Sequence, residues 1–184
     1  MDKSERIILG IDPGTSIMGY GVIGSSGKKP VYQDMGVLDL RKVSDQYLKL
    51  KRIFETTIEL IDKYNPDELA IEAPFYGKNV QSMLKLGRAQ GIAISAALTR
   101  DIPIFEYAPR KIKLAVTGVG QASKEQVSGM LEKMFLIKEM PKNLDATDGL
   151  AVAVCHFYEK SPGAKKPGVK SWGDFIAKNP GRVK

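Results

Sequence analysis

A tight turn between two apolar runs constrains the fold of this chain more than any other feature. Residues 6–12 and 17–24 are predicted as strands, and the turn Asp-Pro-Gly-Thr-Ser joins them. The turn Ser-Ser-Gly-Lys-Lys-Pro then leads into a third predicted strand near 31–40. Strands joined by turns this short pair antiparallel, so the chain is predicted to open with a three-stranded meander.

Helical and strand-like segments alternate after the meander. Apolar residues recur at helical spacing over 45–64, and short apolar runs that end at prolines predict strands at 68–74 and 102–109. A long helix, 80–98, is predicted between these two strands. Further helices are predicted at about 110–117, 124–136 and 146–159. The order predicts an α/β fold in which a mixed five-stranded sheet, an antiparallel meander plus two parallel strands, is flanked by helices.

Positive charge is concentrated at the C-terminal end of the chain. The formal net charge is +7, and six Lys or Arg against one acid give residues 161–184 a charge of +5. Only +2 remains for residues 1–160. We expect one globular domain over 1–160 and a basic, flexible tail over 161–184, with any nucleic acid bound by a local basic face of the domain.

Composition also limits the compartment and the metal chemistry. The chain has no apolar stretch long enough to cross a membrane and no secretion signal, so we expect a cytoplasmic protein with no membrane partner. A single cysteine, Cys155, excludes an internal disulfide framework. With one cysteine and one histidine, His156, the chain is not expected to form a zinc site.

Four acidic residues occupy unusual positions. Asp12 ends an apolar run, and Glu72 lies inside another, where a charged group is costly unless something positive meets it. Asp145 and Asp148 are spaced i, i+3 at a predicted helix start, so they share one face. Taken singly, Glu72 fits a solvent-facing carboxylate on an edge strand, and the aspartate pair fits a helix cap.

Together the four acids predict a metal site. Gathered at strand ends and a helix start, they would repel one another and take up protons unless cations compensated them. Oxygen ligands alone favour Mg²⁺, with Mn²⁺ as a substitute, over zinc. Two such ions about 4 Å apart activate water and stabilise the leaving oxygen of a phosphodiester. The chemistry predicted is metal-dependent phosphodiester hydrolysis.

The segments that carry these acids resemble the RuvC family of bacterial Holliday junction resolvases. The resemblance covers residues 6–158 and lies in four blocks, "IILGIDPGTSIMGYGVI", "AIEAPFYGKNVQSMLKLGRAQGIAISAAL", "IFEYAPRKIKLAVTGVGQASKEQV" and "DATDGLAVAV". It implies a ribonuclease H-like nuclease domain, a homodimer, and two Mg²⁺ ions per subunit. It also implies paired symmetric nicks in a four-way DNA junction, in recombination and repair, that leave 5′-phosphate and 3′-hydroxyl ends.

The resemblance also assigns roles to individual residues. The four carboxylates match the family's catalytic metal ligands, and Phe75 matches an aromatic that acts against an unstacked base, although an ordinary core phenylalanine fits as well. Lys113 and Lys124 match basic residues near the DNA. Between them, the loop "TGVGQASK" and the helix start that follows, with Ser123 as N-cap, are predicted to hold a phosphate. Further basic residues could extend this DNA-binding face: Lys78, Lys85, Arg88, Arg110 and Lys111.

Partners and rival functions complete the expectations. Small residues along the predicted helix 80–98 permit close packing, which could be packing on the sheet alone, and the resemblance favours the use of this helix in a dimer interface. The resemblance suggests cooperation with the RuvA and RuvB branch-migration complex. "GIDPGTS" also resembles the phosphate loop of actin-like ATPases and sugar kinases, so a phosphotransferase lobe is one alternative. A YqgF-type nuclease and a catalytically inactive nucleic-acid binder are the others.

Overall fold

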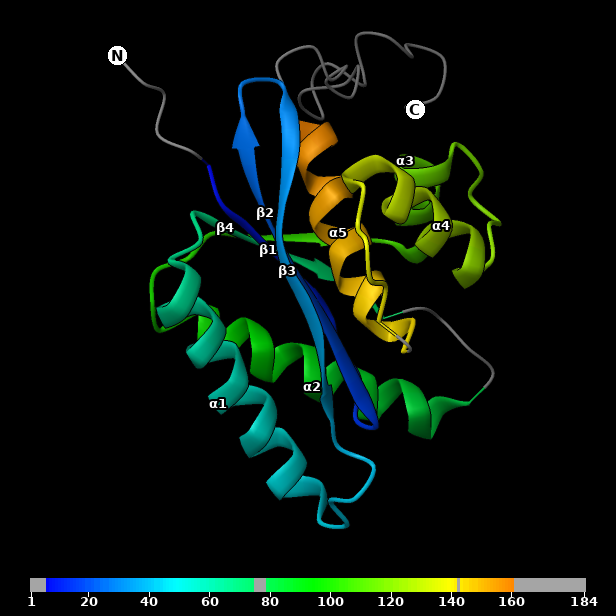
Figure 1. Cartoon of the computed structure of the whole chain (residues 1–184). Coiled ribbons are helices and arrows are strands. Elements are labelled where there is room, and N and C mark those ends of the chain that lie inside the picture. Colours follow the sequence, from blue (N-terminus) through cyan, green and yellow to red (C-terminus); the bar gives the residue numbers. More distant parts are fainter. Residues whose placement is uncertain (1–5, 75–78, 142, 161–184) are drawn as a thin grey trace, which may run out of the picture.

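A single mixed sheet organises the molecule, a computed structural model that describes residues 6–74, 79–141 and 143–160 (Figure 1). The sheet has the strand order β3-β2-β1-β4-β5. Strand β1 pairs antiparallel with β2 and parallel with β4, β2 pairs antiparallel with β3, and β4 pairs parallel with β5. The strands span β1 Ile8–Asp12, β2 Ile17–Ser26, β3 Lys29–Asp39, β4 Glu68–Glu72 and β5 Ile104–Tyr107. The predicted mixed sheet of a meander and two parallel strands is confirmed.

Helices cover both faces of the sheet (Figure 1). Two of them, α1 and α2, contact each other on one face, and α5 lies across the other face with α3 and α4 outside it. The helices span α1 Gln46–Tyr64, α2 Val80–Leu98, α3 Pro109–Thr117, α4 Lys124–Phe135 and α5 Asp145–Lys160. The predicted order of elements is correct, with boundaries shifted by one or two residues. The predicted tail, 161–184, lies outside the described residues, so the division of the chain at residue 160 stays a prediction.

Alternation along β1 separates two cores. Leu9 and Ile11 join the cluster under α1 and α2, whereas Ile8 joins the cluster under α5. On β4, Ile71 packs toward α1 and α2, and Ala70 packs toward α5. Because side chains alternate faces along a strand, the even-numbered positions of both strands face α5.

Glycines bring α5 into direct contact with the sheet backbone. A Cβ on Gly149 would lie 2.4 Å from the Cα of Tyr20, and one on Gly21 would lie 2.3 Å from the Cα of Leu150. At Gly19, a Cβ would lie 2.0 Å from the carbonyl oxygen of Asp145. Any side chain at these positions would push the start of α5 away from β1 and β2.

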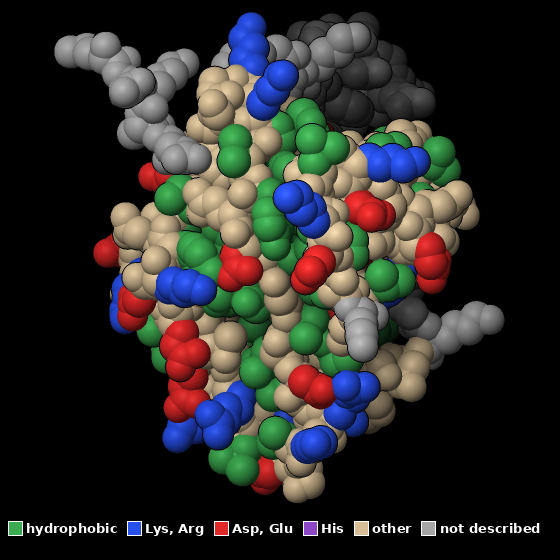
Figure 2. All heavy atoms as spheres, in the orientation of Figure 1, with side chains coloured by type: hydrophobic (Ala, Val, Ile, Leu, Met, Phe, Trp, Pro, Cys, Tyr) green, Lys and Arg blue, Asp and Glu red, His purple; other side chains and the backbone are tan. Residues whose placement is uncertain are grey.

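The hydropathy of the described helices and the charge on one face of the molecule bear on the expected partners. Among the described helices, none is long and apolar enough to cross a bilayer. On the face in Figure 2, the acidic and basic side chains of the described residues are interspersed.

Candidate active site at the carboxyl ends of the central strands

Two of the predicted acids end neighbouring parallel strands. Asp12 is the last residue of β1 and Glu72 the last of β4, and the pairing of these strands runs up to Ile11 opposite Ile71. Both acids hold even-numbered positions, so both face α5. The pairing of the two strands therefore places two carboxylates side by side at the carboxyl ends of the central strands.

The first turn of α5 supplies the other two acids. Asp145 begins the helix and Asp148 follows three residues later, and the close contact of α5 with the sheet holds that turn over β1. The main-chain N–H of Asp145 donates to the Asn143 side chain at 3.0 Å. Both carboxylates instead accept hydrogen bonds from Lys124, at 2.7 Å for Asp145 and 2.6 Å for Asp148. The two aspartates thus face the site and not the end of their own helix.

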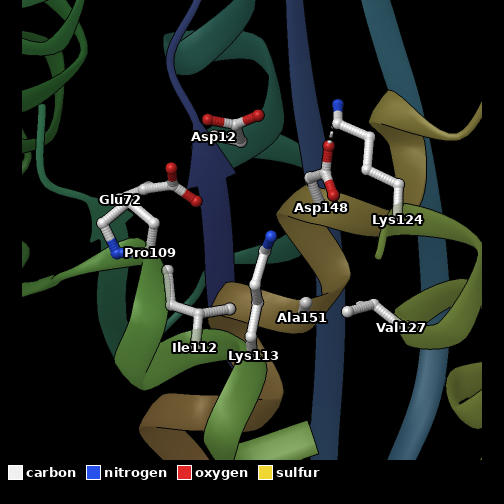
Figure 3. A pocket seen from close by; sticks show the side chains of 9 residues that line it. All are labelled: Asp12, Glu72, Pro109, Ile112, Lys113, Lys124, Val127, Asp148 and Ala151. Atoms are coloured by element: carbon white, nitrogen blue, oxygen red, sulfur yellow. Dashed lines mark hydrogen bonds and ion pairs between the residues drawn. The ribbon is translucent and has the colours of Figure 1, made fainter. Parts of the chain in front are cut away.

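Carboxylates and lysines meet in a pocket of about 230 Å³ (Figure 3). The carboxylates of Asp12, Glu72 and Asp148 point toward one space, which the amino groups of Lys113 and Lys124 enter from α3 and α4. Apolar wall residues complete the lining: Pro109, Ile112, Val127 and Ala151. The structure thus brings together three of the four predicted acids in the pocket, with the fourth, Asp145, bonded to Lys124 beside it.

Burial and mutual repulsion raise the pKa values of the acids in the pocket. For Asp12, burial and then the charges of Glu72 and Asp148 hold the pKa well above its usual range. Burial and then the charge of Asp148 raise the pKa of Glu72 to about 7. The pKa of Asp148 is raised by burial, although its hydrogen bond from Lys124 opposes the shift. The cluster as it stands has too little positive charge to keep its acids ionised.

Lys124 is the positive group that partly meets this need. Burial disfavours its ammonium, but the hydrogen bonds to Asp145 and Asp148 outweigh burial and raise its pKa. The Lys124 ammonium is thus a compact cation that two carboxylates hold by hydrogen bonds. This single positive charge is shared between Asp145 and Asp148.

The donor set fits Mg²⁺ or Mn²⁺ in its chemistry. All four acids offer hard carboxylate oxygens, and no softer ligand lines the pocket among the described residues. Within that described part, no three acidic, His or Cys side chains are drawn closely enough around one point to hold an ion. This spacing agrees with repulsion between like charges and with Lys124 holding the aspartate pair.

The remaining basic candidates are placed unequally. Lys113 lines the pocket, whereas exposed Arg110 lies against the loop at Gly120, where an added Cβ would meet its side chain at 2.8 Å. Lys111 pairs with Glu159 at 3.0 Å, outside the pocket. Lys85 and Arg88 are exposed on α2. Phe75 and Lys78 lie outside the described residues.

The start of α4 forms a complete capping box, and the expectation that this segment holds a phosphate stays a prediction. Ser123 caps the helix as predicted, but its hydroxyl accepts the Gln126 main-chain N–H while the Gln126 side chain accepts the N–H of Ser123. The carboxylate of Glu125 accepts hydrogen bonds from the Ser123 side chain and from the main-chain N–H of Glu125, and these bonds lower its pKa. The N–H groups of Ser123 and Gln126 are therefore already hydrogen-bonded within the start of α4.

Sequence reasoning also missed structural contributors to the site. The apolar wall from α3 and the glycines under α5 were not predicted as site residues. Helical spacing of Pro109, Ile112 and Lys113 was a signal that could have placed the wall beside the lysine. No local pattern marks Gly19 or Gly149, because their close contacts join segments more than one hundred residues apart.

Comparisons with known proteins indicate one family. The family described as "Crossover junction endodeoxyribonuclease RuvC" matches residues 8–156. Proteins of that name from Bacteroides fragilis and Porphyromonas gingivalis are 62% and 57% identical to this chain. The alignments cover 98% of this chain and 97% of the first relative, and 100% of both chains for the second.

A solved structure gives the same result at the level of the fold. T. thermophilus RuvC in complex with Holliday junction substrate has a TM-score of 0.78 and 30% sequence identity, over 88% of this chain and 99% of that one. The ribonuclease H-like fold predicted from the resemblance is confirmed. On the family match, the near-complete coverage and the shared fold, the chain belongs to the RuvC family of crossover junction endodeoxyribonucleases.

Proposed function

We propose that this chain resolves four-way DNA junctions by paired, symmetric, metal-dependent nicks. The observation that carries the proposal is the pocket in which Asp12, Glu72 and Asp148 meet Lys113 and Lys124, in a chain of the RuvC family. Its T. thermophilus relative was solved with a Holliday junction substrate. The pocket, with acids to hold cations and lysines to meet phosphate, suits the same class of substrate.

The four carboxylates are the proposed catalytic metal ligands. Asp12, Glu72, Asp145 and Asp148 would hold two Mg²⁺ ions per subunit, and Mn²⁺ would substitute. Such a pair, when bound, lowers the pKa of an attacking water and stabilises the leaving oxygen of a phosphodiester, which leaves 5′-phosphate and 3′-hydroxyl ends. The raised pKa values of Asp12 and Glu72 support this role, because added positive charge would return both groups to the ionised form.

The lysines are proposed to hold the DNA backbone. Lys113 and Lys124 reach the pocket from different helices, so they can contact phosphate oxygens from two sides. Lys124 has a second role, because metal binding to Asp145 and Asp148 would free its ammonium for the phosphate. The apolar wall formed by Ile112 and Val127 limits access of bulk water to the acids.

Neighbouring residues extend the proposed DNA contact. Arg110 lies on the same helix as Lys113 and is exposed beside the loop at Gly120. Phe75 follows Glu72 by three residues in the sequence, and its proposed role is to stack on an unpaired base at the junction. Lys78 follows in the same segment.

A homodimer is proposed through α2. Its alanines at 89, 93, 96 and 97 are buried within the protomer, but a Cβ at Gly87 or Gly91 would meet no atom within 4 Å. Val80 and Leu84 on the same helix are exposed. Packing within one protomer does not require small residues at positions 87 and 91, so these glycines suit close contact with a second copy. The two-fold symmetry of such a dimer would present two active sites to two DNA strands.

The cellular setting follows from the same family. We propose a bacterial, cytoplasmic protein that acts with the RuvA and RuvB branch-migration complex. The single, buried Cys155 agrees with a reducing compartment.

The decisive experiment uses a synthetic four-way junction and a linear duplex of the same sequence. With Mg²⁺, the wild type should nick the junction in two opposed strands and leave the duplex intact. Asp12→Asn should lower nicking by more than about 100-fold. Loss of a group that only hydrogen-bonds to a metal ligand typically costs roughly 10- to 100-fold in activity, and loss of a ligand itself should cost more. Junction binding in Ca²⁺ should persist.

Other outcomes would favour the rival functions. ATP hydrolysis without junction cleavage would favour the phosphotransferase lobe, and cleavage of RNA alone would favour a YqgF-type nuclease. Junction binding with no cleavage by the wild type in Mg²⁺ or Mn²⁺ would identify an inactive binder.

A further inference from the structure

Gln90 is a polar side chain on the face of α2 that packs against the sheet. Ala89 and Ala93 beside it are fully buried, and Gln90 is only 8% exposed. A buried amide is costly unless its hydrogen bonds are made. The side-chain amide nitrogen donates to Glu106 Oε2 at 2.8 Å and to the main-chain carbonyl oxygen of Glu72 at 3.4 Å. One side chain of α2 therefore contacts the ends of both β4 and β5.

The Glu72 carbonyl faces β1 and not β5. Leu69 and Ala73 donate their main-chain N–H groups toward β5, to the carbonyl oxygens of Pro103 and Tyr107, each at 2.9 Å. Successive residues of a strand direct their main-chain groups to opposite neighbours. The main chain of Glu72 must then find its partners on β1.

Pro13 removes the partner that β1 would supply. The paired residues of β1 and β4 run from Ile8 opposite Glu68 to Ile11 opposite Ile71. Continuing this ladder, the donor to the Glu72 carbonyl would be the nitrogen of residue 13, and proline has no N–H. The pairing between the two strands accordingly stops at Ile11 and Ile71. The Gln90 amide approaches the carbonyl that the ladder leaves without its donor.

We propose that Gln90 is a positioning residue for the Glu72 carboxylate. By holding the last peptide of β4, it fixes the direction in which the Glu72 side chain leaves the strand toward Asp12 and Asp148. Two residues later Pro74 again lacks an N–H, so the main chain just beyond Glu72 gains little support from that side. Gln90 acts through the peptide and touches neither substrate nor metal, and its effect on cleavage rests on the proposed function.

The first test needs no DNA and measures amide hydrogen exchange along β4. In Gln90→Leu, loss of the donor should loosen the end of the strand, so the Ala73 amide should exchange roughly 2- to 10-fold faster. The Leu69 amide, at the start of the same strand, is the internal control and should keep its rate. Equal acceleration at both amides, or none at Ala73, would overturn the proposal. This test stands even if the chain proves not to cleave junctions.

The second test separates positioning from simple attachment of α2 to β5. Exchanging the pair, Gln90→Glu with Glu106→Gln, restores a side-chain hydrogen bond between α2 and β5 but turns a carboxylate toward the Glu72 carbonyl. We expect near wild-type thermal stability, unchanged junction binding in Ca²⁺, and roughly 10- to 100-fold slower cleavage at saturating junction. Glu106→Gln alone keeps an acceptor for Gln90 and should cleave normally.

The exchanged pair gives the sharper outcome. If it cleaves at the wild-type rate, Gln90 serves only to join the two elements, and the positioning role is wrong. If both the single Gln90→Leu variant and the exchanged pair cleave slowly while binding is retained, the role is established.

Discussion

Strand β4 carries two glutamates, one at each end, and the protein treats them in opposite ways. Glu68 and Glu72 are four residues apart and share the face toward α5. Arg6 and His156 hydrogen-bond to Glu68, and these bonds lower its pKa although burial opposes them. Glu72 faces other acids, and its pKa is raised to about 7. The glutamate at one end of β4 thus has hydrogen-bonding partners within the chain, whereas the glutamate at the other end lies among acids that lack enough positive charge.

The difference shows what distinguishes a functional charge from a structural one. At the Glu68 end, buried His156 also bonds the Tyr107 hydroxyl through Nδ1 at 2.6 Å, so each polar group has a partner within the chain. At the Glu72 end, Lys124 is shared by two aspartates and cannot neutralise all the acids. A cluster that the protein leaves short of positive charge is one that a ligand must complete.

Exchanging each glutamate for glutamine gives the largest expected contrast. Glu72→Gln should lower junction cleavage by more than about 100-fold, because it removes a proposed metal ligand, and should leave the metal-free protein no less stable. Glu68→Gln should keep cleavage and lower the free energy of unfolding by about 1–3 kcal/mol, because Arg6 and His156 lose a partly buried anion.

Steady-state cleavage and urea unfolding of the two variants check this contrast. Loss of cleavage in Glu68→Gln at a temperature where it is folded would mean that the two ends of β4 do not have separate roles.

A methyl group under α5 should disturb the acidic end selectively. In Gly149→Ala, the new Cβ would meet the Tyr20 main chain at 2.4 Å, which neither backbone can easily relieve. We expect a loss of about 3 kcal/mol of stability, and lower cleavage because the turn that carries Asp145 and Asp148 shifts. The matched control is Gly129→Ala in α4, where a Cβ meets nothing within 4 Å, so helix propensity should raise stability by up to about 1 kcal/mol.

Thermal unfolding and cleavage of both alanine variants measure the two effects. A Gly149→Ala protein as stable and active as the wild type would show that close contact between α5 and the sheet does not position the aspartates.

The sequence predicted the parts of this comparison that depend on local pattern. Apolar periodicity located the strands and helices, and acids inside apolar runs identified Asp12 and Glu72 as candidate ligands. It did not predict the partners of Glu68, because Arg6 and His156 reach it from 62 and 88 residues away. The satisfied start of α4 was also missed, since a serine cap alone does not reveal that Gln126 completes the box.

Contacts formed by close backbone approach were equally hidden. Gly149 contacts the sheet backbone, and Gln90 contacts the Glu72 carbonyl, only after α5 and α2 pack on the sheet. Neither residue therefore stands out in the sequence. The roles of Phe75 and Lys78 stay predictions.

Stability without metal should respond to pH in opposite directions at the two ends. Glu72 has a folded-state pKa of about 7 against 4.5 for an unperturbed glutamate, so the folded protein binds more protons between these values, and stability falls as pH rises from 5 to 8. The loss should be about 2 kcal/mol, and raised pKa values at Asp12 and Asp148 act in the same direction. The lowered pKa of Glu68 gives stability that is present above 4.5 and lost only as pH falls further.

Chemical unfolding in EDTA at several pH values, repeated with Glu72→Gln and with Mg²⁺, separates these contributions. Glu72→Gln should flatten the loss between pH 5 and 8, and Mg²⁺ should flatten it further, because bound cations favour the ionised acids that the folded protein otherwise resists. Glu68→Gln should leave that slope unchanged and alter only the acid limb. If the slope between pH 5 and 8 followed Glu68 and not Glu72, the assignment of the uncompensated charge to the Glu72 end of β4 would be wrong.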